Sequence, residues 1–436
     1  MKNLKFLLLL IVCAGAFTSC LKDECNSSFE VFTYEPVYMS KAEMNGQTIT
    51  TESPIPLKNP GKIYYYGNAL FVSETGEGVH IFDNSDKMNP IPLAFLKIPG
   101  NEDVAFKGNH LFADSYLNIL VIDLADLDNP QVVSTIEDIK PDYFYYDESK
   151  EAYIVDYVIS DKTTSLPCNH PFFERPNNDY YLDDWRIMSL DNSFVAVESG
   201  VFADGAFFNS QGTSPGIAGS LSSFALVGDF FYFINGSDVN VYNIADFNNP
   251  FFTDGFQVAW NIETLFPYQD NLFIGGQNGM YIYDNSDPSS PVYMSEFVHA
   301  RACDPVFVEG STAYVTLSEG NACTNFVNQL DVIDISNLYE PTLIKSYDMY
   351  KPKGLSVYDN TLFLCDEKAG IKIYDTSDKT AITQNKLGAI QGKTFIEVIH
   401  MSPTEIMGVG PEGIFQYNVS DVETPVLLSH IEVEID

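Results

Sequence analysis

Basic residues are scarce in this chain of 436 residues. Lysine and arginine together number 23, against 60 aspartates and glutamates, and the formal net charge is −37. A surface this acidic repels phosphate backbones and anionic lipid headgroups. The composition therefore excludes nucleic acid as a partner of the body of the protein.

Catalytic signatures are also missing. The six histidines include no pair at zinc-ligand spacing, and the sequence has no nucleophile elbow, phosphate loop or dinucleotide fingerprint. We expect no metal and no cofactor, and the sequence favours a protein that is not an enzyme. An enzyme whose polar groups come from distant parts of the chain stays an alternative, because such a site leaves no local motif.

Long apolar runs are absent beyond the N-terminus. Lys2 and Lys5 precede an apolar run over residues 6–17, which is too short to cross a hydrocarbon core of roughly 30 Å. Residues 1–19 therefore read as a secretory signal peptide. Residues 17–20 resemble a bacterial lipobox, in which Cys20 is the lipidated residue; the alternative is an ordinary cleavage site beside a cysteine.

A charged segment follows Cys20. Residues 21–24, Leu-Lys-Asp-Glu, resemble the export signal of Bacteroidetes surface lipoproteins, and the alternative is a solvated linker. The resemblance implies a protein anchored by lipid in the outer membrane and facing the cell exterior. Residues 20–35 are expected to form the anchor and tether, and residues 36–57 an N-terminal strand and a short helix. Ser40 and Glu43 have capping-box spacing for that helix.

One pattern recurs along the rest of the chain: a β-rich run ends in Asp or Asn, and a small polar turn follows, usually with a proline. The repeated positions are Asp83, Asp123, Asn243, Asp284, Asp334, Asp375 and Asn418. A period near 40 residues is typical of a four-stranded propeller blade. The second unit, for example, predicts strands over 104–106, 110–114, 119–124 and 131–135.

The interval between Asp123 and Asn243 is three periods long. One further unit is legible over residues 143–159, followed by an insertion at 160–216. The sequence thus predicts an all-β protein, a β-propeller over residues 58–436 with eight four-stranded blades, of which seven are clear repeats and one is degenerate. The last unit contains its own outer strand, so the ring is expected to close without strand exchange.

The repeated turn resembles that of the LVIVD-repeat proteins, whose name is echoed by residues 120–123. The resemblance covers about residues 58–435 and implies the propeller fold, but no settled activity, cofactor or catalytic residue. The Asp and Asn side chains of the turns do not have EF-hand spacing. They are expected to cap the turns and not to bind calcium, because Asx side chains accept hydrogen bonds from the backbone two residues on.

Five cysteines remain once Cys13 and Cys20 are set aside. Cys303 and Cys323 are the disulfide candidate, because the bond would pin the enlarged loop of one unit in an oxidising compartment. Cys365 lies in an apolar run and is expected to be a buried hydrophobic residue.

Propellers usually bind ligands where the loops leading into the innermost strands converge. The ligand-binding candidates at these positions are Glu102, Asp103, Trp260, Glu263, Arg301, Asp304, Lys353 and Lys393. Arg301, Lys353 and Lys393 come from consecutive units and could hold a carboxylate or an acidic sugar; the alternative is pairing with nearby acids. Aromatic residues of the 160–216 insertion form either a second binding surface or a satellite core.

These observations lead to a hypothesis about function. The sequence predicts a cell-surface, lipid-anchored propeller that acts as a binding module for a glycan or a protein. The alternatives are an enzyme, such as a lyase or hydrolase with a site at the channel mouth, and a structural subunit of an envelope assembly. A large exposed apolar patch would favour the structural subunit.

Overall fold

The computed structural model describes residues 28–139, 144–167, 217–218, 222–260, 262–298, 305–318 and 328–434. The chain divides into two compact units. The larger contains Met39–Tyr153 and Val195–Asp436, and the smaller contains Met1–Tyr38 and Ile154–Phe194. In the described ranges, no helix has the length and apolar character that crossing a membrane requires.

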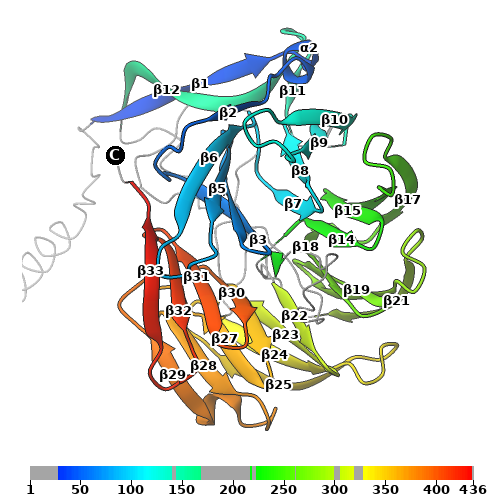
Figure 1. Ribbon diagram of the computed structural model, residues 1–436, viewed down its shortest axis with the longest axis vertical. Helices are drawn as coiled ribbons and strands as arrows, with labels where there is room; N and C mark the ends of the chain where they lie inside the picture. The colour runs from blue at the N-terminus through cyan, green and yellow to red at the C-terminus, as the bar shows by residue number, and fades with distance from the viewer. Residues whose placement is uncertain are drawn as a thin grey trace, which may run out of the picture. The chain divides into compact units, whose positions relative to one another are not determined.

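The larger unit contains seven blades, each a meander of four antiparallel strands, and their innermost strands surround a common centre (Figure 1). Blades one to three are β3–β6 (Pro60–Tyr66, Ala69–Glu74, Gly78–Asp83, Ile91–Lys97), β7–β10 (Val104–Lys107, His110–Ser115, Asn118–Asp123, Gln131–Ile136) and β14–β17 (Phe224–Val227, Phe230–Asn235, Asp238–Asn243, Phe251–Gln257). Blades four and five are β18–β21 (Ile262–Tyr268, Asn271–Gly276, Gly279–Asp284, Val292–Val298) and β22–β25 (Val306–Glu309, Thr312–Leu317, Gln329–Asp334, Thr342–Asp348). Blades six and seven are β26–β29 (Leu355–Tyr358, Thr361–Cys365, Ile371–Asp375, Lys386–Ile390) and β30–β33 (Glu397–Ser402, Glu405–Gly410, Gly413–Asn418, Val426–Glu432).

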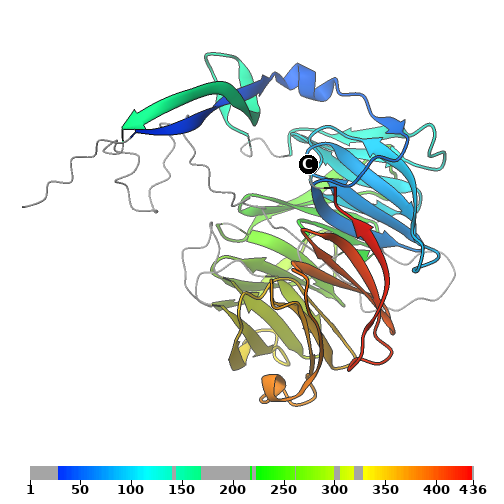
Figure 2. The ribbon, with the colours of Figure 1, turned by 90° about the vertical axis from the view of Figure 1, so that its left-hand side faces the viewer.

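The all-β class and the propeller architecture are confirmed, and each of the seven clear repeats is a four-stranded blade. The strands of blade two begin within one residue of the predicted positions. We call the end of the ring where each innermost strand begins the top face. The bottom face is the opposite end, which carries the loop between the third and fourth strand of each blade. Figure 2 shows the same blades from the side.

The degenerate eighth unit differs from the four-stranded blade that the sequence predicted. β11 (Tyr146–Asp147) and β12 (Ala152–Pro167) form a three-stranded sheet with β1 (Ser28–Met39), in the order β1-β12-β11. Blades two and three are direct neighbours, because Phe112 stacks on Phe231 with ring centroids 5.0 Å apart. Among the described residues no further blade separates them, and the ring that these residues form has seven blades.

The N-terminal segment contains the predicted strand and helix. The helix α2 (Lys41–Asn45) has the predicted capping box, in which Ser40 and Glu43 bond each other's backbone N–H groups. Residues 28–35, assigned to the tether, instead belong to β1. After α2, the short strand β2 (Thr50–Glu52) pairs with three of the seven residues of the outer strand of blade one and covers that part of its open edge.

The ring closes without strand exchange, as the sequence predicted, because blade seven contains all four of its own strands. Several contacts join the last blade to the first part of the ring, among them the following. Leu57 forms a parallel bridge with Val433. The side chains of Asn84 and Gln416 exchange two hydrogen bonds of 2.8 and 2.9 Å in the buried contact between blades one and seven.

The repeated Asp and Asn residues cap the turns, as the sequence predicted. In every blade the side-chain Oδ1 atom of the repeated residue accepts a hydrogen bond from the backbone N–H two residues on, as in Asp83 with Ser85 at 2.9 Å. A second Asx residue three positions later does the same, as in Asp86 with Met88. Two such turns in succession define the route of each bottom loop.

Every outer strand contains one extra residue. The register between the third and fourth strands shifts at the same place in all seven blades, for example between Ile282 and Tyr283 in blade four. Such bulges bend an edge strand and reduce its tendency to pair with other chains.

Hydroxyl groups of blades two, four and five bond to the bottom loop of the next blade. Ser134 donates to the carbonyl oxygen of Phe247 at 2.7 Å, and Ser295 donates to that of Leu338 at 2.6 Å. Tyr347 of blade five donates to the carbonyl of Lys379 at 2.7 Å and accepts from the N–H of Ile382 at 3.0 Å. These bonds satisfy backbone groups that the blade contacts bury.

Replacing Tyr347 with phenylalanine should lower the free energy of unfolding by about 1–3 kcal/mol, because two buried backbone groups lose their partner. The measurement is the urea midpoint at constant pH. Tyr339→Phe is the control, since Tyr339 is 71% exposed and its change should stay within about 0.5 kcal/mol. Equal midpoints for the two variants would show that the hydroxyl of Tyr347 is not a stabilising contact.

Candidate functional site

The described ligand-binding candidates lie in the loops of the top face. Arg301 and Asp304 lie outside the described residues, so the proposed group of three cations can be followed only at Lys353 and Lys393. The other candidates, Glu102, Asp103, Trp260 and Glu263, are described and fall into two separate regions. The first region contains a polar network across blades one to three, and the second contains an exposed tryptophan.

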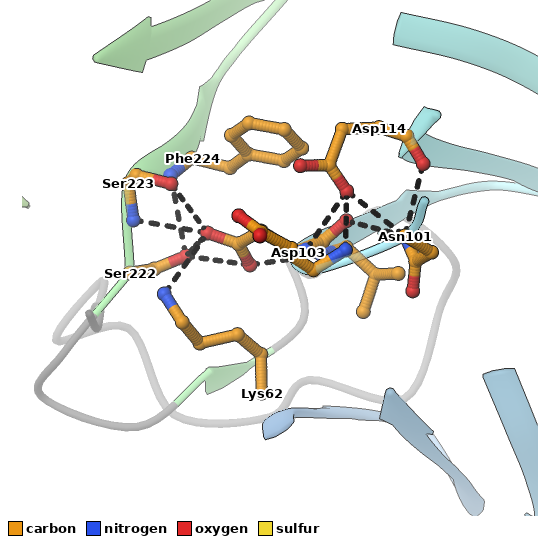
Figure 3. A network of polar contacts seen from close by, with 9 residues as sticks. Lys62, Asn101, Asp103, Asp114, Ser222, Ser223 and Phe224 are labelled. Carbon is orange, nitrogen blue, oxygen red and sulfur yellow. Dashed lines mark hydrogen bonds and ion pairs between the residues drawn. The ribbon is translucent and has the colours of Figure 1, made fainter. Parts of the chain in front are cut away.

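Asp103 is the centre of the network (Figure 3). It precedes β7, and its side chain is only 3% exposed. Its carboxylate accepts from the backbone N–H of Val104 at 2.8 Å, and from the N–H and hydroxyl of Ser223 at 3.0 and 2.8 Å. Ser222 donates its hydroxyl at 3.1 Å, and Lys62 of blade one approaches to 3.4 Å. Asp103 thus joins the inner strands of three blades, and its oxygens are occupied within the protein.

A second buried carboxylate shapes the loop before Asp103. Asp114, on β8, accepts from the side chain of Asn101 at 3.0 Å and from the N–H groups of Glu102 and Asp103 at 2.7 and 2.9 Å. The loop therefore curls around one side chain, and the backbone of the candidate Glu102 is held by it. Buried carboxylates are stable when several N–H groups donate to them.

The same arrangement occurs in other blades. Asp366, fully buried after β27, accepts from the N–H groups of Tyr350 and Lys351 and pairs with Lys372. Glu74 accepts from two backbone N–H groups and from His80, 2.8 Å away. Burial raises the pKa of Glu74, but the bonds from His80 and the backbone outweigh it and leave the pKa below its usual value. The buried carboxylates of these top loops thus support the loops.

The two described lysines occupy different surroundings. The side chain of Lys393 forms an ion pair with Glu412 and lies over the ring of Phe415, 5.2 Å from its centroid. The backbone of Lys353 is held between strands: its N–H donates to Cys365, and its carbonyl accepts from Thr316. The sequence left open the alternative that these lysines pair with nearby acids. The geometry shows such a pair for Lys393.

Trp260 is the most exposed large apolar side chain of the described residues, at 80%. It lies on the top face between β17 and β18, three residues before Glu263, which is half-buried. The carboxylate of Glu263 accepts from the side-chain amide of Gln277 at 3.4 Å. The exposed indole offers a stacking surface, and Glu263 and Gln277 add hydrogen-bonding groups to the top face.

Charge in this region has one sign. Residues 222–298, which form blades three and four, contain nine Asp and Glu residues and no Lys, Arg or His. In the described ranges, no group of three or more His, Cys, Asp and Glu side chains is placed to hold a metal ion. The position of Trp260 before an inner strand is enough to select it from the sequence. The absence of basic residues from two whole blades can be recognised only when the boundaries of the blades are known.

His400 lies in the core of blade seven, with its ring 4.5 Å from that of Tyr358. Burial lowers the pKa of His400 to about 4, against about 6.5 in an unfolded chain. Between pH 4 and pH 6.5 the unfolded state binds a proton at His400 and the folded state does not. The free energy of unfolding is therefore unaffected above pH 6.5 and falls as the pH is lowered towards 4, by about 3 kcal/mol in all. We expect His400→Phe to remove this part of the pH dependence, measured as urea midpoints at pH 7 and pH 4.5. The same pH dependence of stability in His400→Phe and in the parent protein would contradict this expectation.

The cysteine predictions have different outcomes. Cys20, the lipidation candidate, and Cys303 and Cys323, the disulfide candidate, lie outside the described residues. Cys365 is completely buried among apolar side chains, which confirms that prediction.

Comparisons with known proteins found similarity to a family model and to solved structures. A family model described as "LVIVD repeat" matches residues 268–298 and 309–349, in blades four and five. The designed protein Ika8 has a TM-score of 0.48 at 9% identity, over 86% of this chain and 88% of that chain. Hsv2 from Kluyveromyces marxianus has a TM-score of 0.48 at 10% identity, over 88% and 100%. No curated protein matches.

A propeller with such repeats is consistent with a binding module. The chain is thus a β-propeller protein that contains LVIVD repeats.

Proposed function

We propose that the protein is a lipid-anchored binding module on the outer surface of the cell, and that it recognises a glycan at its top face. The anchor part of the proposal rests on residues 1–24, with Cys20 as the lipidated residue. The recognition part rests on one observation above all: Trp260 exposes 80% of its surface to solvent in a loop of the top face.

The chemistry around Trp260 favours a sugar. The indole face stacks against the apolar C–H face of a pyranose ring, and Glu263 and Gln277 offer acceptors and donors for hydroxyl groups. An acidic sugar at Trp260 would meet no cation from blades three and four, which contain carboxylates and no Lys, Arg or His. The ligand class that fits best is therefore an uncharged glycan, in place of the carboxylate that the three cations suggested.

A glycan array tests the proposal, with residues 26–436 as the soluble form and with and without calcium. Trp260→Ala should weaken binding to an uncharged glycan at least tenfold, which corresponds to about 1.4 kcal/mol. The control is the variant with Arg301, Lys353 and Lys393 changed to alanine, which should bind normally. Binding that is lost in the control and kept in Trp260→Ala would place the ligand at the cations and contradict the proposal, as would the absence of any glycan binding.

A further inference from the structure

The outer strands expose apolar side chains on the bottom half of the ring, at the opposite end of β17 from Trp260. Phe251 and Phe252 begin β17, and Val292 and Tyr293 begin β21; all four are between 52% and 62% exposed. We call these four residues the rim patch. β17 and β21 are neighbouring outer strands of blades three and four (Figure 1).

The rim patch is held in place by contacts from within the two blades. The ring of Phe252 meets that of Tyr242 edge-on at 5.5 Å, and the ring of Tyr293 meets that of Tyr283 at 5.6 Å. Across the two blades, the hydroxyl of Ser290 donates to the carboxylate of Asp254 at 2.9 Å. A surface whose side chains are already ordered loses little conformational entropy when a partner binds.

Carboxylates lie close to the rim patch. Asp284 ends β20 and pairs in register with Val292, and Asp246 and Asp287 lie in the bottom loops that lead into β17 and β21. Hydrogen bonds from the backbone and side chain of Ser286 lower the pKa of Asp284, and those from Ser289 lower the pKa of Asp287. Asp284 and Asp287 therefore stay ionised well below neutral pH, and residues 222–298 contain no Lys, Arg or His to balance the carboxylates.

This charge pattern decides between occupants. A second copy of the chain has 60 acidic and 23 basic residues and would be repelled, and an anionic lipid surface would be repelled as well. Apolar residues in the centre of an acidic surface complement a partner with apolar residues among lysines and arginines. From the rim patch and its carboxylates, we infer that blades three and four dock a basic, apolar segment of another protein. This surface is separate from the top-face glycan site, and it would connect the protein to an envelope assembly.

The test uses labelled synthetic peptides and the full chain, in one nonionic detergent throughout, with fluorescence anisotropy at 50 and 300 mM salt. The first 16-residue peptide contains lysine and phenylalanine. In the second, glutamate replaces lysine, and in the third, serine replaces phenylalanine. We expect only the lysine–phenylalanine peptide to bind, and at least tenfold more weakly at 300 mM salt.

Two variants locate the binding. The first, Phe251→Ser with Val292→Ser, removes apolar surface; the second changes Asp246, Asp284 and Asp287 to asparagine. The asparagine side chain keeps the turn, because Asn337 caps the equivalent turn of blade five. Each should weaken binding at least tenfold. The control carries Glu77→Gln, Glu137→Gln and Asp348→Asn, an equal change of charge at exposed positions elsewhere, and should bind normally.

Three results would overturn the inference. The first is equal binding by all variants, and the second is equal binding of the serine peptide, which would indicate attraction by net charge alone. The third is self-association of the full chain, seen in sedimentation velocity and abolished by the Phe251→Ser, Val292→Ser variant; that result would assign the rim patch to a second copy. Melting temperatures of the variants, expected to stay near that of the parent, exclude unfolding as a cause.

Discussion

Replacing Gly354 with valine should destabilise the protein by at least about 3 kcal/mol. Gly354 precedes the inner strand of blade six, where its N–H donates to the carbonyl of Ile396 at 2.9 Å. A Cβ atom at this position would lie 2.3 Å from Oε1 of Glu397 and 2.9 Å from its Cα. The Cα atom is backbone, so the side chain of Glu397 cannot relieve the clash by rotating alone. Blades six and seven would have to separate, and overpacking of this kind is strongly destabilising.

The matched control is Gly61→Val, at the equivalent place in blade one. There the nearest atom to a new Cβ would be the side-chain hydroxyl oxygen of Thr75, at 3.0 Å, which can move. Neither glycine has a positive φ, so lack of space and not backbone freedom sets the cost. The midpoint of urea unfolding measures the loss of stability in each of the two variants. A Gly354→Val protein as stable as Gly61→Val would show that the inner strands approach less closely than described.

Replacing Asp103 with alanine should lower the free energy of unfolding by about 3–5 kcal/mol. The change leaves the N–H groups of Val104 and Ser223 without their acceptor and removes the anion beside Lys62. Removing one partner of a buried charged network costs more than the network contributes, because the remaining groups stay desolvated. Asp103→Asn should lose less, since the amide oxygen still accepts hydrogen bonds.

Asp229→Ala is the control for Asp103. Asp229 also pairs with a lysine, Lys107, at 2.8 Å, but its side chain is 63% exposed, so its loss should cost at most about 1 kcal/mol. Urea unfolding of the two alanine variants at pH 7 makes the comparison. Equal losses would mean that the network does not join the blades as its geometry indicates.

The sequence predicts the blades well because each repeat specifies its own local structure. In each repeat, an Asx residue two positions before a backbone N–H group encodes the bottom turn. Short, nearly continuous apolar runs encode the strands, which are buried on both faces. The capping box of α2 is similarly local, since Ser40 and Glu43 are three residues apart.

Contacts between distant residues could not be predicted in this way. Asp103 was a ligand candidate because of its position before an inner strand, but Ser222, 119 residues away, occupies its carboxylate. Likewise, the pattern over residues 143–159 identifies strands but not their partners, so the pairing of β12 with β1 was not foreseen. A strand pattern is a property of one segment, whereas pairing depends on two.

The most direct test of the proposed recognition site is the fluorescence of Trp260 itself. The chain has two tryptophans, Trp185 and Trp260, so the Trp185→Phe variant reports on Trp260 alone. We predict that titration with the uncharged glycan selected on the array shifts the emission to shorter wavelength and saturates, because stacking removes the exposed indole from water. Saturable binding measured by calorimetry with no change in this emission would contradict the proposal that Trp260 contacts the ligand.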